Sequence, residues 1–546
     1  MLVSDAVKAK TYTGAQIILK TLYGLGIDTV FGYPGSAVLN IYDALYNQKE
    51  IKHYLVRHEQ AAVHAAEGYT RASGKCGVVF VTSGPGAANT VSGIANAYAD
   101  GYPIIVITGQ VSKNVKGTGA FQEIDILDMT KSCTKSGYSV TSIETLQSTL
   151  KDAYYSAISG KKGPVVVDIS KDVFEESASI EVGLDYSETL PQVSSDVLAK
   201  ILDEIKNSKN PVIVAGGGVV HSNAYKELRK VVELLDIPVV NTMMGIGCIS
   251  YDDKHYAGMI GTFGSEHAND IIRKSDLILS LGARFNDKVR SCFNAEKFSG
   301  KFIQIDINKN EISRVIPAYM SVIADIKVFL DGLIKVIKDS DYIGLHNNFK
   351  DAVSIINEEN IVLPSEKISS ENIIKELYNA TKNIEPVITT EVGQHQIFTV
   401  KNYKFSNPHQ LIISGGMGTM GFGLPAAIGA CIAENKRPVI CIAGDGSFQM
   451  NEQELATIKE YNLPVKIFIM NNGSLGMIRQ LQHYSCEDRY SQTEILNPDF
   501  VKLAEAYGIQ SCRVTDGMSI KTAIEKALSE NGPYLLDFVI DTFEII

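Results

Sequence analysis

The stretch RPVICIAGDGSFQMNEQELATIKEYNLPVKIFIMNNG, residues 437–473, contains two short apolar runs separated by a helical segment. The first run, VICIA, ends at the triplet Gly444-Asp445-Gly446, and the second, VKIFIM, ends at Asn471-Asn472. Short apolar runs that alternate with amphipathic segments are typical of buried parallel strands. Because the carboxyl ends of neighbouring parallel strands meet at one edge of a sheet, we expect Asp445 and Asn472 to lie close together.

These two residues carry oxygen atoms that suit a hard cation. Mg²⁺ takes about six oxygen ligands at about 2.1 Å. Asp445 offers a carboxylate, Asn472 an amide oxygen, and Ser474 a backbone carbonyl. Two phosphate oxygens and a water would complete the set, and Gly444 and Gly446 would let backbone N–H groups approach the anion. A Gly-Asp-Gly triplet alone is more often an ordinary turn, but the two strand ends together predict a Mg²⁺-diphosphate site.

The same alternation recurs along the chain and indicates an α/β protein with parallel sheets. Further strands are predicted at GKCGVVFVTSGPG, YPIIVITG, GPVVVDIS, NPVIVAGGG, SDLILSLGA and KFIQIDIN. Polar segments near residues 174–195 and 347–370 have the composition of junctions. We therefore predict three doubly wound domains, at residues 1–178, 190–345 and 365–546.

Composition restricts the class of protein. The net charge of −11 argues against general binding to nucleic acid or to an anionic membrane. The N-terminus has no apolar core of signal-peptide length, and no apolar run approaches the length of a membrane span. The 8 scattered cysteines form no CxxC pair and are typical of free thiols in a reducing compartment. We expect a cytoplasmic protein.

Nine segments in one order resemble the catalytic chain of acetohydroxyacid (acetolactate) synthases. They are FGYPGSAVLNIYDAL, RHEQAAVHAAEGYTRASGK, VTSGPGAANTVSGIANAYAD, TGAFQEIDI, SCTKSGY, EVGQHQ, GGMGTMGFGLPAAIGA, GDGSFQMNEQELATIKEYNLPVKI and NNGSLGMIRQ. The resemblance implies a pyrimidine-binding domain, a central domain of FAD-binding type and a diphosphate-binding domain. It also implies thiamine diphosphate, Mg²⁺ and a non-redox FAD as cofactors.

The resemblance further implies a carboligase that decarboxylates pyruvate and transfers the hydroxyethyl unit to a second 2-oxo acid, giving 2-acetolactate. In this family the glutamate and the metal site of one active site come from different subunits, so we expect a homodimer or a homotetramer. The sequence does not indicate whether a regulatory small subunit binds.

Site residues carry over by position. Glu59 matches the glutamate that hydrogen-bonds the aminopyrimidine ring and promotes loss of the thiazolium C2 proton. Met420 matches the apolar wedge that bends the cofactor, and Gly418 the carbonyl that accepts from its amino group. The expected thiamine diphosphate contacts are Tyr33, Pro34, Glu59, Thr82, Pro85, Asn89, Gly393, Gln394, His395, Gly418, Met420, Gly444, Asp445, Gly446, Ser447, Asn472, Ser474, Leu475, Gly476 and Met477.

Two further sets follow from the same resemblance. Catalytic roles beside Glu59 fall on Phe121, Gln122 and Lys171, and the substrate pocket on Gly35, Ser36, Ala37, Met259, Lys288 and Leu481. The FAD contacts would be Lys161, Gly216, Gly217, Gly218, Thr242, Met244, Gly258, Met259, Gly282, Arg284, Asp306 and Asp325. For each of these residues a plain core, loop or surface role is the alternative.

Departures from the family pattern concentrate around the second substrate. Leu481 stands where the family has tryptophan, Lys288 where it has an arginine, and Ser36 where it has glycine. Lysine lacks the planar fork with which arginine holds a carboxylate. Lys161 and Ile260 likewise replace an arginine and a histidine of the FAD segments.

These departures leave alternatives open. The acceptor could be a second pyruvate, with weak preference for 2-oxobutyrate, or a larger ketone or aldehyde such as a keto-sugar nucleotide. A simple decarboxylase would need a proton donor, and no His-His pair accompanies the pocket stretches. An inactive regulatory paralogue would not need to retain Glu59, Asp445 and Asn472.

Overall fold

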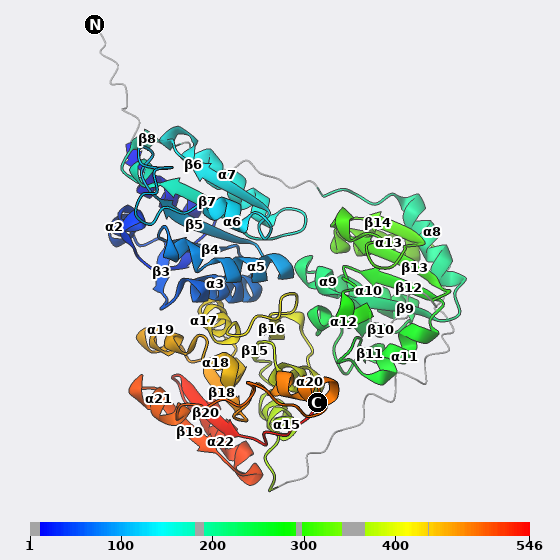
Figure 1. Cartoon of the computed structure of the whole chain (residues 1–546). Coiled ribbons are helices and arrows are strands. Elements are labelled where there is room, and N and C mark those ends of the chain that lie inside the picture. The colour runs from blue at the N-terminus through cyan, green and yellow to red at the C-terminus, as the bar shows by residue number, and fades with distance from the viewer. Residues whose placement is uncertain (1–10, 181–189, 291–297, 341–365, 435) are drawn as a thin grey trace. The chain divides into compact units, whose positions relative to one another are not determined.

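The computed structural model describes residues 11–180, 190–290, 298–340, 366–434 and 436–546 (Figure 1). The chain divides into two compact units: the first comprises residues 1–187, 386–396 and 412–545, and the second residues 188–385, 397–411 and 546. The predicted junctions near 174–195 and 347–370 overlap stretches that lie outside the described residues, namely 181–189 and 341–365. The three predicted domain boundaries therefore stay predictions.

The N-terminal sheet of the first unit is parallel, with strand order β3-β2-β4-β5-β7-β6. Successive side chains of its strands point to opposite faces of the sheet and pack in two different apolar clusters, because helices cover both faces. The strands are β2 (Thr29–Gly32), β3 (Lys52–Leu55), β4 (Gly77–Val81), β5 (Ile104–Gln110), β6 (Ser136–Val140) and β7 (Val165–Ser170). The helices are α1 (Gly14–Gly24), α2 (Leu39–Tyr46), α3 (Glu59–Ser73), α4 (Pro85–Ala88), α5 (Val91–Asp100), α6 (Ile126–Thr130) and α7 (Ile143–Ile158).

A short antiparallel ribbon accompanies this sheet. It pairs β1 (Thr11–Thr13) with β8 (Ser177–Ser179), so the first and last described segments of this third of the chain are joined.

The second sheet of the first unit has the order β16-β15-β17-β18-β20-β19, and its pairings from β15 to β19 are parallel. Its strands are β15 (Val387–Thr390), β16 (Leu411–Ile413), β17 (Val439–Gly444), β18 (Lys466–Asn471), β19 (Gln510–Val514) and β20 (Tyr534–Val539). Its helices are α17 (Gly423–Ala433), α18 (Asp445–Phe448), α19 (Leu455–Glu460), α20 (Gly476–Ser485), α21 (Phe500–Ala506) and α22 (Ile520–Ser529). Helix α16 (Gln394–Asn402) begins in this unit, and its residues from Ile397 on belong to the second unit.

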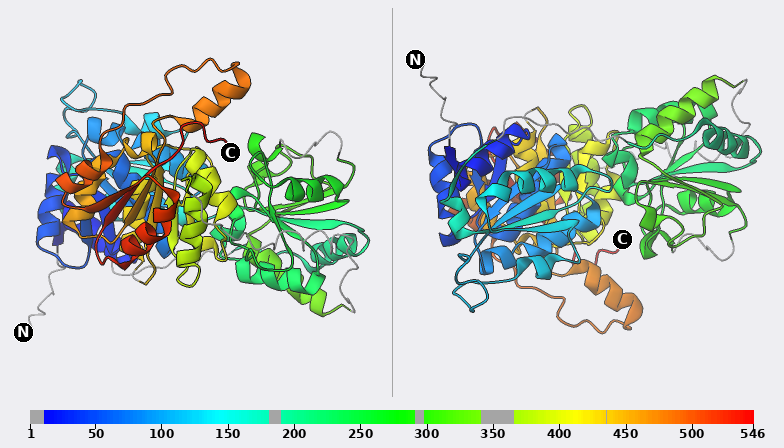
Figure 2. Two further views of the ribbon diagram at one scale, coloured as in Figure 1. Left: turned by 90° about the horizontal axis from the view of Figure 1, so that it is seen from below. Right: turned by 90° about the horizontal axis from the view of Figure 1, so that it is seen from above.

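The second unit holds a parallel sheet of order β11-β10-β9-β12-β13-β14, with helices on both faces (Figure 2). Its strands are β9 (Pro211–Ala215), β10 (Val239–Asn241), β11 (Tyr256–Met259), β12 (Leu277–Leu281), β13 (Lys301–Asp306) and β14 (Met320–Ile323). Its helices are α8 (Ser195–Lys206), α9 (Gly217–His221), α10 (Tyr225–Leu235), α11 (Glu266–Lys274), α12 (Asp287–Arg290), α13 (Ile326–Lys338) and α15 (Ser370–Thr381).

The predicted fold class is confirmed. Every strand predicted from an apolar run is present, and each of the three six-stranded sheets has the crossover order of a doubly wound α/β fold.

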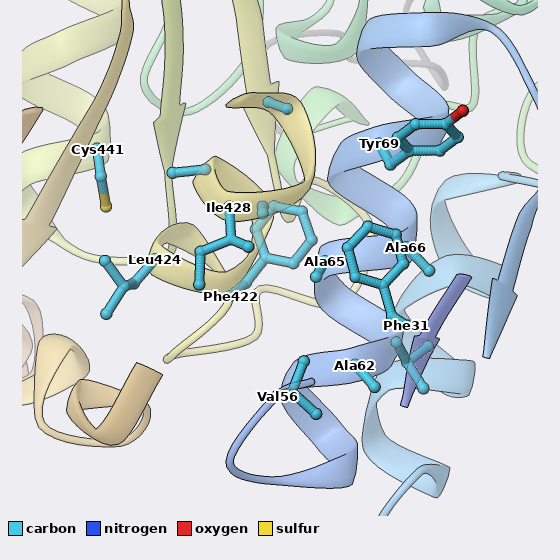
Figure 3. Close-up of a cluster of buried hydrophobic side chains, with 14 of the residues drawn as sticks. Phe31, Val56, Ala62, Ala65, Ala66, Tyr69, Phe422, Leu424, Ile428 and Cys441 are labelled. Carbon is cyan, nitrogen blue, oxygen red and sulfur yellow. The ribbon is translucent and has the colours of Figure 1, made fainter. Parts of the chain in front are cut away.

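Within the first unit, helices α3 and α17 pack against each other at the level of their backbones (Figure 3). A Cβ atom on Gly68 would overlap the backbone of Ala426, and one on Gly429 would lie 2.7 Å from the carbonyl carbon of Ala65. Glycine is required at both positions because no side chain fits between the helices. Phe422, fully buried at the start of α17, packs in the same cluster.

Candidate functional site

Asp445 lies where the sequence predicts it, at the carboxyl end of β17, and is 2% exposed. Its Oδ1 accepts a hydrogen bond from the Gly446 N–H (2.9 Å), and its Oδ2 accepts from the Gly473 N–H and from Asn497 Nδ2 (both 2.7 Å). Burial raises the pKa of this carboxyl, and the three hydrogen bonds partly offset the shift. A nearly buried carboxylate is thus held in one orientation.

Asn472 follows β18, the strand next to β17, so the two predicted metal ligands come from neighbouring strand ends. Its Oδ1 accepts from the Ser474 N–H at 3.0 Å, and the Ser474 carbonyl accepts from the Gly476 N–H at 2.9 Å. Among the described residues, His, Cys, Asp and Glu form no group of three or more that could hold a metal. One carboxylate with amide and carbonyl oxygens is the alternative donor set, and it suits Mg²⁺.

Gln394 and His395, at the start of α16, reach the same strand ends. A Cβ atom on Gly476 would overlap the Gln394 amide and lie 2.7 Å from Asn472 Nδ2, and one on Gly444 would lie 2.8 Å from His395 Nδ1. The two glycines therefore leave the space that these polar side chains fill. Burial lowers the pKa of His395 to about 3, so the imidazole is neutral.

Met420, in the loop before α17, lies next to Gly446 of the Asp445 group. Its ε-methyl lies 4.0 Å from the position of a Cβ atom on Gly446, and the Leu475 side chain lies 2.7 Å from that position. Gly418, in the same loop, has φ +68°, a conformation that favours glycine. Ser447, with 2% exposure, donates to the Gly444 carbonyl (3.2 Å), and Met477 lies in the first turn of α20.

Glu59 is the first residue of α3, the helix that comes after β3, and its side chain contacts the segment that follows β4. Its Oε2 accepts a hydrogen bond from Asn89 Nδ2 at 2.9 Å, and its Oε1 lies 3.3 Å from the Cβ position of Gly86. Thr82, directly after β4, accepts from the Ala37 N–H at 3.2 Å. The other predicted residues of this group follow two neighbouring strands. Tyr33, Pro34, Gly35 and Ser36 come after β2, and Pro85 comes after β4.

The remaining predicted catalytic residues lie around this second group. Gln122 adopts φ +63°, and its Cβ lies 2.9 Å from the Cβ position of Gly84, in the turn after β4. Phe121 is 89% exposed, and Lys171 is half-buried directly after β7.

In the second unit, glycine-rich turns follow neighbouring strands. A Cβ atom on Gly218, after β9, would lie 2.6 Å from the Cα of Gly282, after β12, and one on Gly217 would lie 3.2 Å from the Met244 Cβ. The other predicted FAD residues at strand ends are Gly216, Thr242, Gly258, Met259, Arg284 and Asp306. The structure thus brings most of this set to one edge of the sheet.

Two predicted FAD residues make different contacts. Asp325 caps helix α13 by accepting from the N–H groups of Lys327 (2.9 Å) and Val328 (3.2 Å). Lys161 lies in the first unit, where its ammonium is 4.8 Å from the centre of the Tyr98 ring.

Helix α20 stands away from the second sheet of the first unit (orange in Figure 2) and carries Leu481, which is 52% exposed. Ile478 and Tyr484, one turn before and after, are 47% and 65% exposed. Lys288 is also exposed and pairs with Asp287 at 3.3 Å.

Three family models match the chain: the N-terminal TPP binding domain (residues 12–129), the central domain (198–333) and the C-terminal TPP binding domain (391–538) of thiamine pyrophosphate enzymes. The acetolactate synthase isozyme 2 large subunit of Escherichia coli is 38% identical over 535 residues, covering 97% of this chain and 96% of the relative.

Other relatives are as similar. The acetolactate synthase large subunit of Lactococcus lactis is 38% identical, with 98% of this chain and 94% of the relative covered. The probable acetolactate synthase large subunit of Methanocaldococcus jannaschii is 40% identical, with 98% and 93% covered. The chain belongs to the acetolactate synthase large-subunit family.

Within this acetolactate synthase family fold, the structure reveals contacts that sequence reasoning missed. Asn497 donates to Asp445 and to Asn471 Oδ1 (2.9 Å), and its own Oδ1 accepts from Gln449 (2.9 Å). The sequence around it, NPDF, signals only a turn. Asn497 therefore orients the carboxylate of the predicted metal ligand.

Residues 542–544, near the C-terminus, also contact two of the predicted cofactor-binding residues of this acetolactate synthase family member. Thr542 Oγ1 donates to the Asn472 carbonyl, at 2.7 Å, and Gln394 Nε2 donates to the Glu544 carbonyl, at 2.8 Å. No local pattern in the sequence indicates these contacts. No described helix combines the length and apolar character that crossing a membrane requires.

Proposed function

We propose that the chain is a thiamine-diphosphate-dependent acetolactate synthase that decarboxylates pyruvate and transfers the two-carbon unit to a second 2-oxo acid. The observation that carries the proposal is the buried carboxylate of Asp445 beside Asn472, on a chain similar to acetolactate synthases over nearly its whole length. When bound, thiamine diphosphate supplies the electron sink for decarboxylation.

The Asp445 group has the chemistry to hold Mg²⁺ and a diphosphate. We assign the metal to the Asp445 carboxylate, the Asn472 amide oxygen and the Ser474 carbonyl. This assignment is supported by the shared sheet edge and by the three hydrogen bonds that fix Asp445. Neutral His395 can donate a hydrogen bond to a phosphate oxygen. Gln394 would do so in place of one of the bonds that its amide donates to Gln480 and Glu544.

Glu59 is the proposed activator of the cofactor ring. Its carboxylate is oriented by Asn89, and it begins helix α3, whose N-terminus favours a negative charge. Met420 and Gly418 would hold the ring from the other side. The resemblance to acetolactate synthases implies that the glutamate and the metal site of one active site come from different subunits, so we propose that a second copy of the chain completes each site, in a homodimer or a homotetramer.

FAD is proposed as a structural cofactor of the second unit. The proposal is supported by the glycine-rich turns that converge after β9, β10 and β12, at one edge of the sheet. Asp325 caps α13 through Oδ1, and its FAD contact stays a prediction. A cytoplasmic location stays a prediction, supported by the free thiols of the described cysteines.

The acceptor is proposed to be a second pyruvate. Pocket roles are proposed for Gly35, Ser36, Ala37, Met259, Lys288, Leu481, Phe121, Gln122 and Lys171. The relatives named above are all acetolactate synthases, so transfer to a keto-sugar nucleotide, the alternative considered for the widened pocket, is not favoured.

The decisive experiment supplies pyruvate alone, with Mg²⁺, thiamine diphosphate and FAD, and measures 2-acetolactate and CO₂. We expect steady acetolactate formation at about 1 s⁻¹ or more, within the ordinary range of enzymes. CO₂ release with little acetolactate would contradict pyruvate as the acceptor, and no turnover of pyruvate at all would contradict the donor reaction.

Leu481→Trp is expected to raise the preference for 2-oxobutyrate over pyruvate by roughly tenfold, the scale of one added hydrophobic contact. The family has a tryptophan at this position, and its ring would narrow the proposed acceptor pocket. Competition of the two acceptors in one tube measures the product ratio directly. Tyr484→Trp, on the same exposed helix, is the matched control. Equal product ratios in the two variants would show that position 481 does not line the acceptor pocket.

A further inference from the structure

Helix α5 binds the loop that carries Met420. This loop, residues 414–422, connects β16 to α17. Asp100, the last residue of α5, accepts hydrogen bonds from the N–H groups of Gly415 (3.1 Å) and Gly416 (2.5 Å). A Cβ atom on Gly416 would lie 2.7 Å from Asp100 Oδ1, so a side chain at this position would push the two segments apart. The start of the loop is therefore fixed to the N-terminal sheet's helices.

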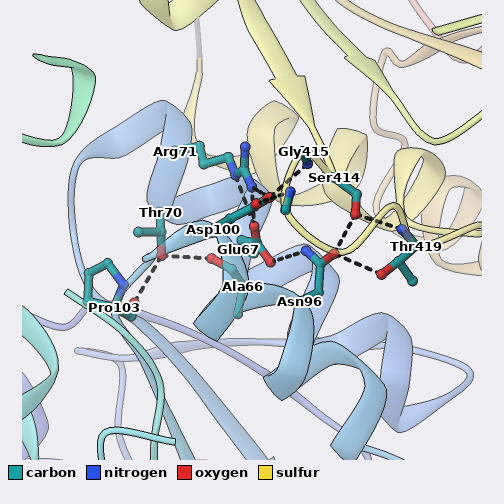
Figure 4. Close-up of polar contacts among 11 residues, drawn as sticks. Ala66, Glu67, Thr70, Arg71, Asn96, Asp100, Pro103, Ser414, Gly415 and Thr419 are labelled. Carbon is teal, nitrogen blue, oxygen red and sulfur yellow. Dashed lines mark hydrogen bonds and ion pairs between the residues drawn. The ribbon is translucent and has the colours of Figure 1, made fainter. Parts of the chain in front are cut away.

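Asn96, one turn earlier on α5, ties together two more points of the loop (Figure 4). Its Oδ1 accepts from Ser414 Oγ (2.5 Å) and from Thr419 Oγ1 (2.8 Å). Ser414 Oγ in turn accepts from the Thr419 N–H at 2.7 Å. Asn96 and Ser414 are 0% and 1% exposed, so these hydrogen bonds do not compete with water. One buried amide thus fixes the residue directly before Met420.

Glu67, Arg71, Asn96 and Asp100 form a buried charged cluster to which the loop donates hydrogen bonds. Arg71 donates to Glu67 and to Asp100 (2.6 Å), and Asn96 Nδ2 donates to Glu67 Oε2 (2.9 Å). Two buried carboxylates therefore share one guanidinium, and burial raises the pKa of Glu67. Buried carboxylates are costly without donors, so the remaining acceptor capacity of Asp100 is met by the two loop N–H groups. The docked loop therefore supplies two of the hydrogen bonds that the buried Asp100 carboxylate accepts.

The far end of the loop is held as well. The Arg71 guanidinium lies 5.5 Å from the centre of the Phe422 ring, and the His64 ring packs edge-on against the same ring at 5.2 Å. With both ends and its middle fixed, the loop presents the Met420 ε-methyl beside Gly446, next to the proposed metal ligand.

We propose that Asn96 and Asp100 are positioning residues for the reaction: they hold loop 414–422 in the form that receives the cofactor before the cofactor binds. This inference rests on the proposed function, because the loop matters to catalysis only if Met420 contacts thiamine diphosphate. Neither residue belongs to the expected set of cofactor contacts.

Ser414→Ala and Thr419→Val test the proposal in the full-length chain. Each removes one hydroxyl from the Asn96 contact with little change in volume. The first readout is amide hydrogen exchange of segment 414–422 without cofactor, and the second is the dissociation constant of thiamine diphosphate with Mg²⁺ by calorimetry. Thr70→Val is the matched control, because the Thr70 hydroxyl is buried on α3 and donates to the Ala66 carbonyl (2.9 Å), with no bond to the loop.

We expect exchange of segment 414–422 to accelerate by about threefold to tenfold in Thr419→Val, the effect of losing about one net hydrogen bond. The acceleration should be larger in Ser414→Ala, which also removes the acceptor of the Thr419 N–H. The dissociation constant should rise by a similar factor, and Thr419→Ser, which keeps the hydroxyl, should restore both values. Unchanged exchange, or the same change in Thr70→Val, would overturn the proposal. Because exchange is measured without cofactor, this result is independent of whether the wild-type chain makes acetolactate.

Discussion

Glu59→Gln is expected to lower kcat for acetolactate formation by about 100-fold or more, the usual scale of proton-transfer catalysis, while thiamine diphosphate still binds. The amide that replaces the carboxylate keeps the shape and an oxygen that can accept from Asn89, but it loses the negative charge that polarises the aminopyrimidine ring. Steady-state kinetics and calorimetric titration of the cofactor measure the two quantities separately.

A matched control distinguishes this effect from a general loss of charge. Glu50→Gln changes an exposed carboxylate before β3 that accepts a hydrogen bond from the neighbouring Lys49 N–H. We expect its kcat to equal that of the wild type. If Glu59→Gln keeps near-normal kcat, or fails to bind the cofactor, the assignment of Glu59 as activator is wrong.

Asp445→Ala is expected to abolish activity and to weaken binding of Mg²⁺ and thiamine diphosphate by more than about 100-fold, because it removes the single carboxylate among the three proposed ligands. The metal-free chain should remain folded, since removing a buried carboxylate also removes its desolvation cost. Calorimetry with Mg²⁺ and the cofactor, together with the unfolding temperature of the metal-free chain, tests both statements.

Asn497→Ala gives the graded comparison. It leaves the ligand in place but removes one of its three hydrogen bonds, so metal affinity should fall by about 10- to 100-fold, the range for residues that orient a ligand. Affinity equal to wild type in Asp445→Ala would refute the metal site itself. Affinity equal to wild type in Asn497→Ala alone would refute only the orienting role of Asn497.

The local pattern of the sequence was sufficient for the parts of the site that depend on sheet geometry. Asp445 and Asn472 meet because they end adjacent parallel strands, and both strands are visible as apolar runs. The glycines around them, Gly444, Gly446 and Gly476, leave room for neighbouring side chains. Such features follow from periodicity and turn chemistry, which act over a few residues.

The contacts that complete the site depend on packing between distant segments and leave no local pattern. Asn497 reaches Asp445 across 52 positions, and Asp100 reaches Gly416 across 316. Asp325, an expected FAD contact, also caps helix α13. Its position directly before the apolar segment of α13 is typical of a cap. Roles taken from resemblance depend on a bound cofactor, so they stay predictions.

The backbone contact between α3 and α17 has a consequence for motion. Because Gly68 and Gly429 each face a backbone with no room for a methyl group, sliding either helix along the other would force a Cβ atom into a carbonyl. Neither hinge bending nor shear is available at such a contact at low cost. We infer that the two sheets of the first unit move as one rigid body during turnover, so that admission of substrate falls to small peripheral elements such as α20.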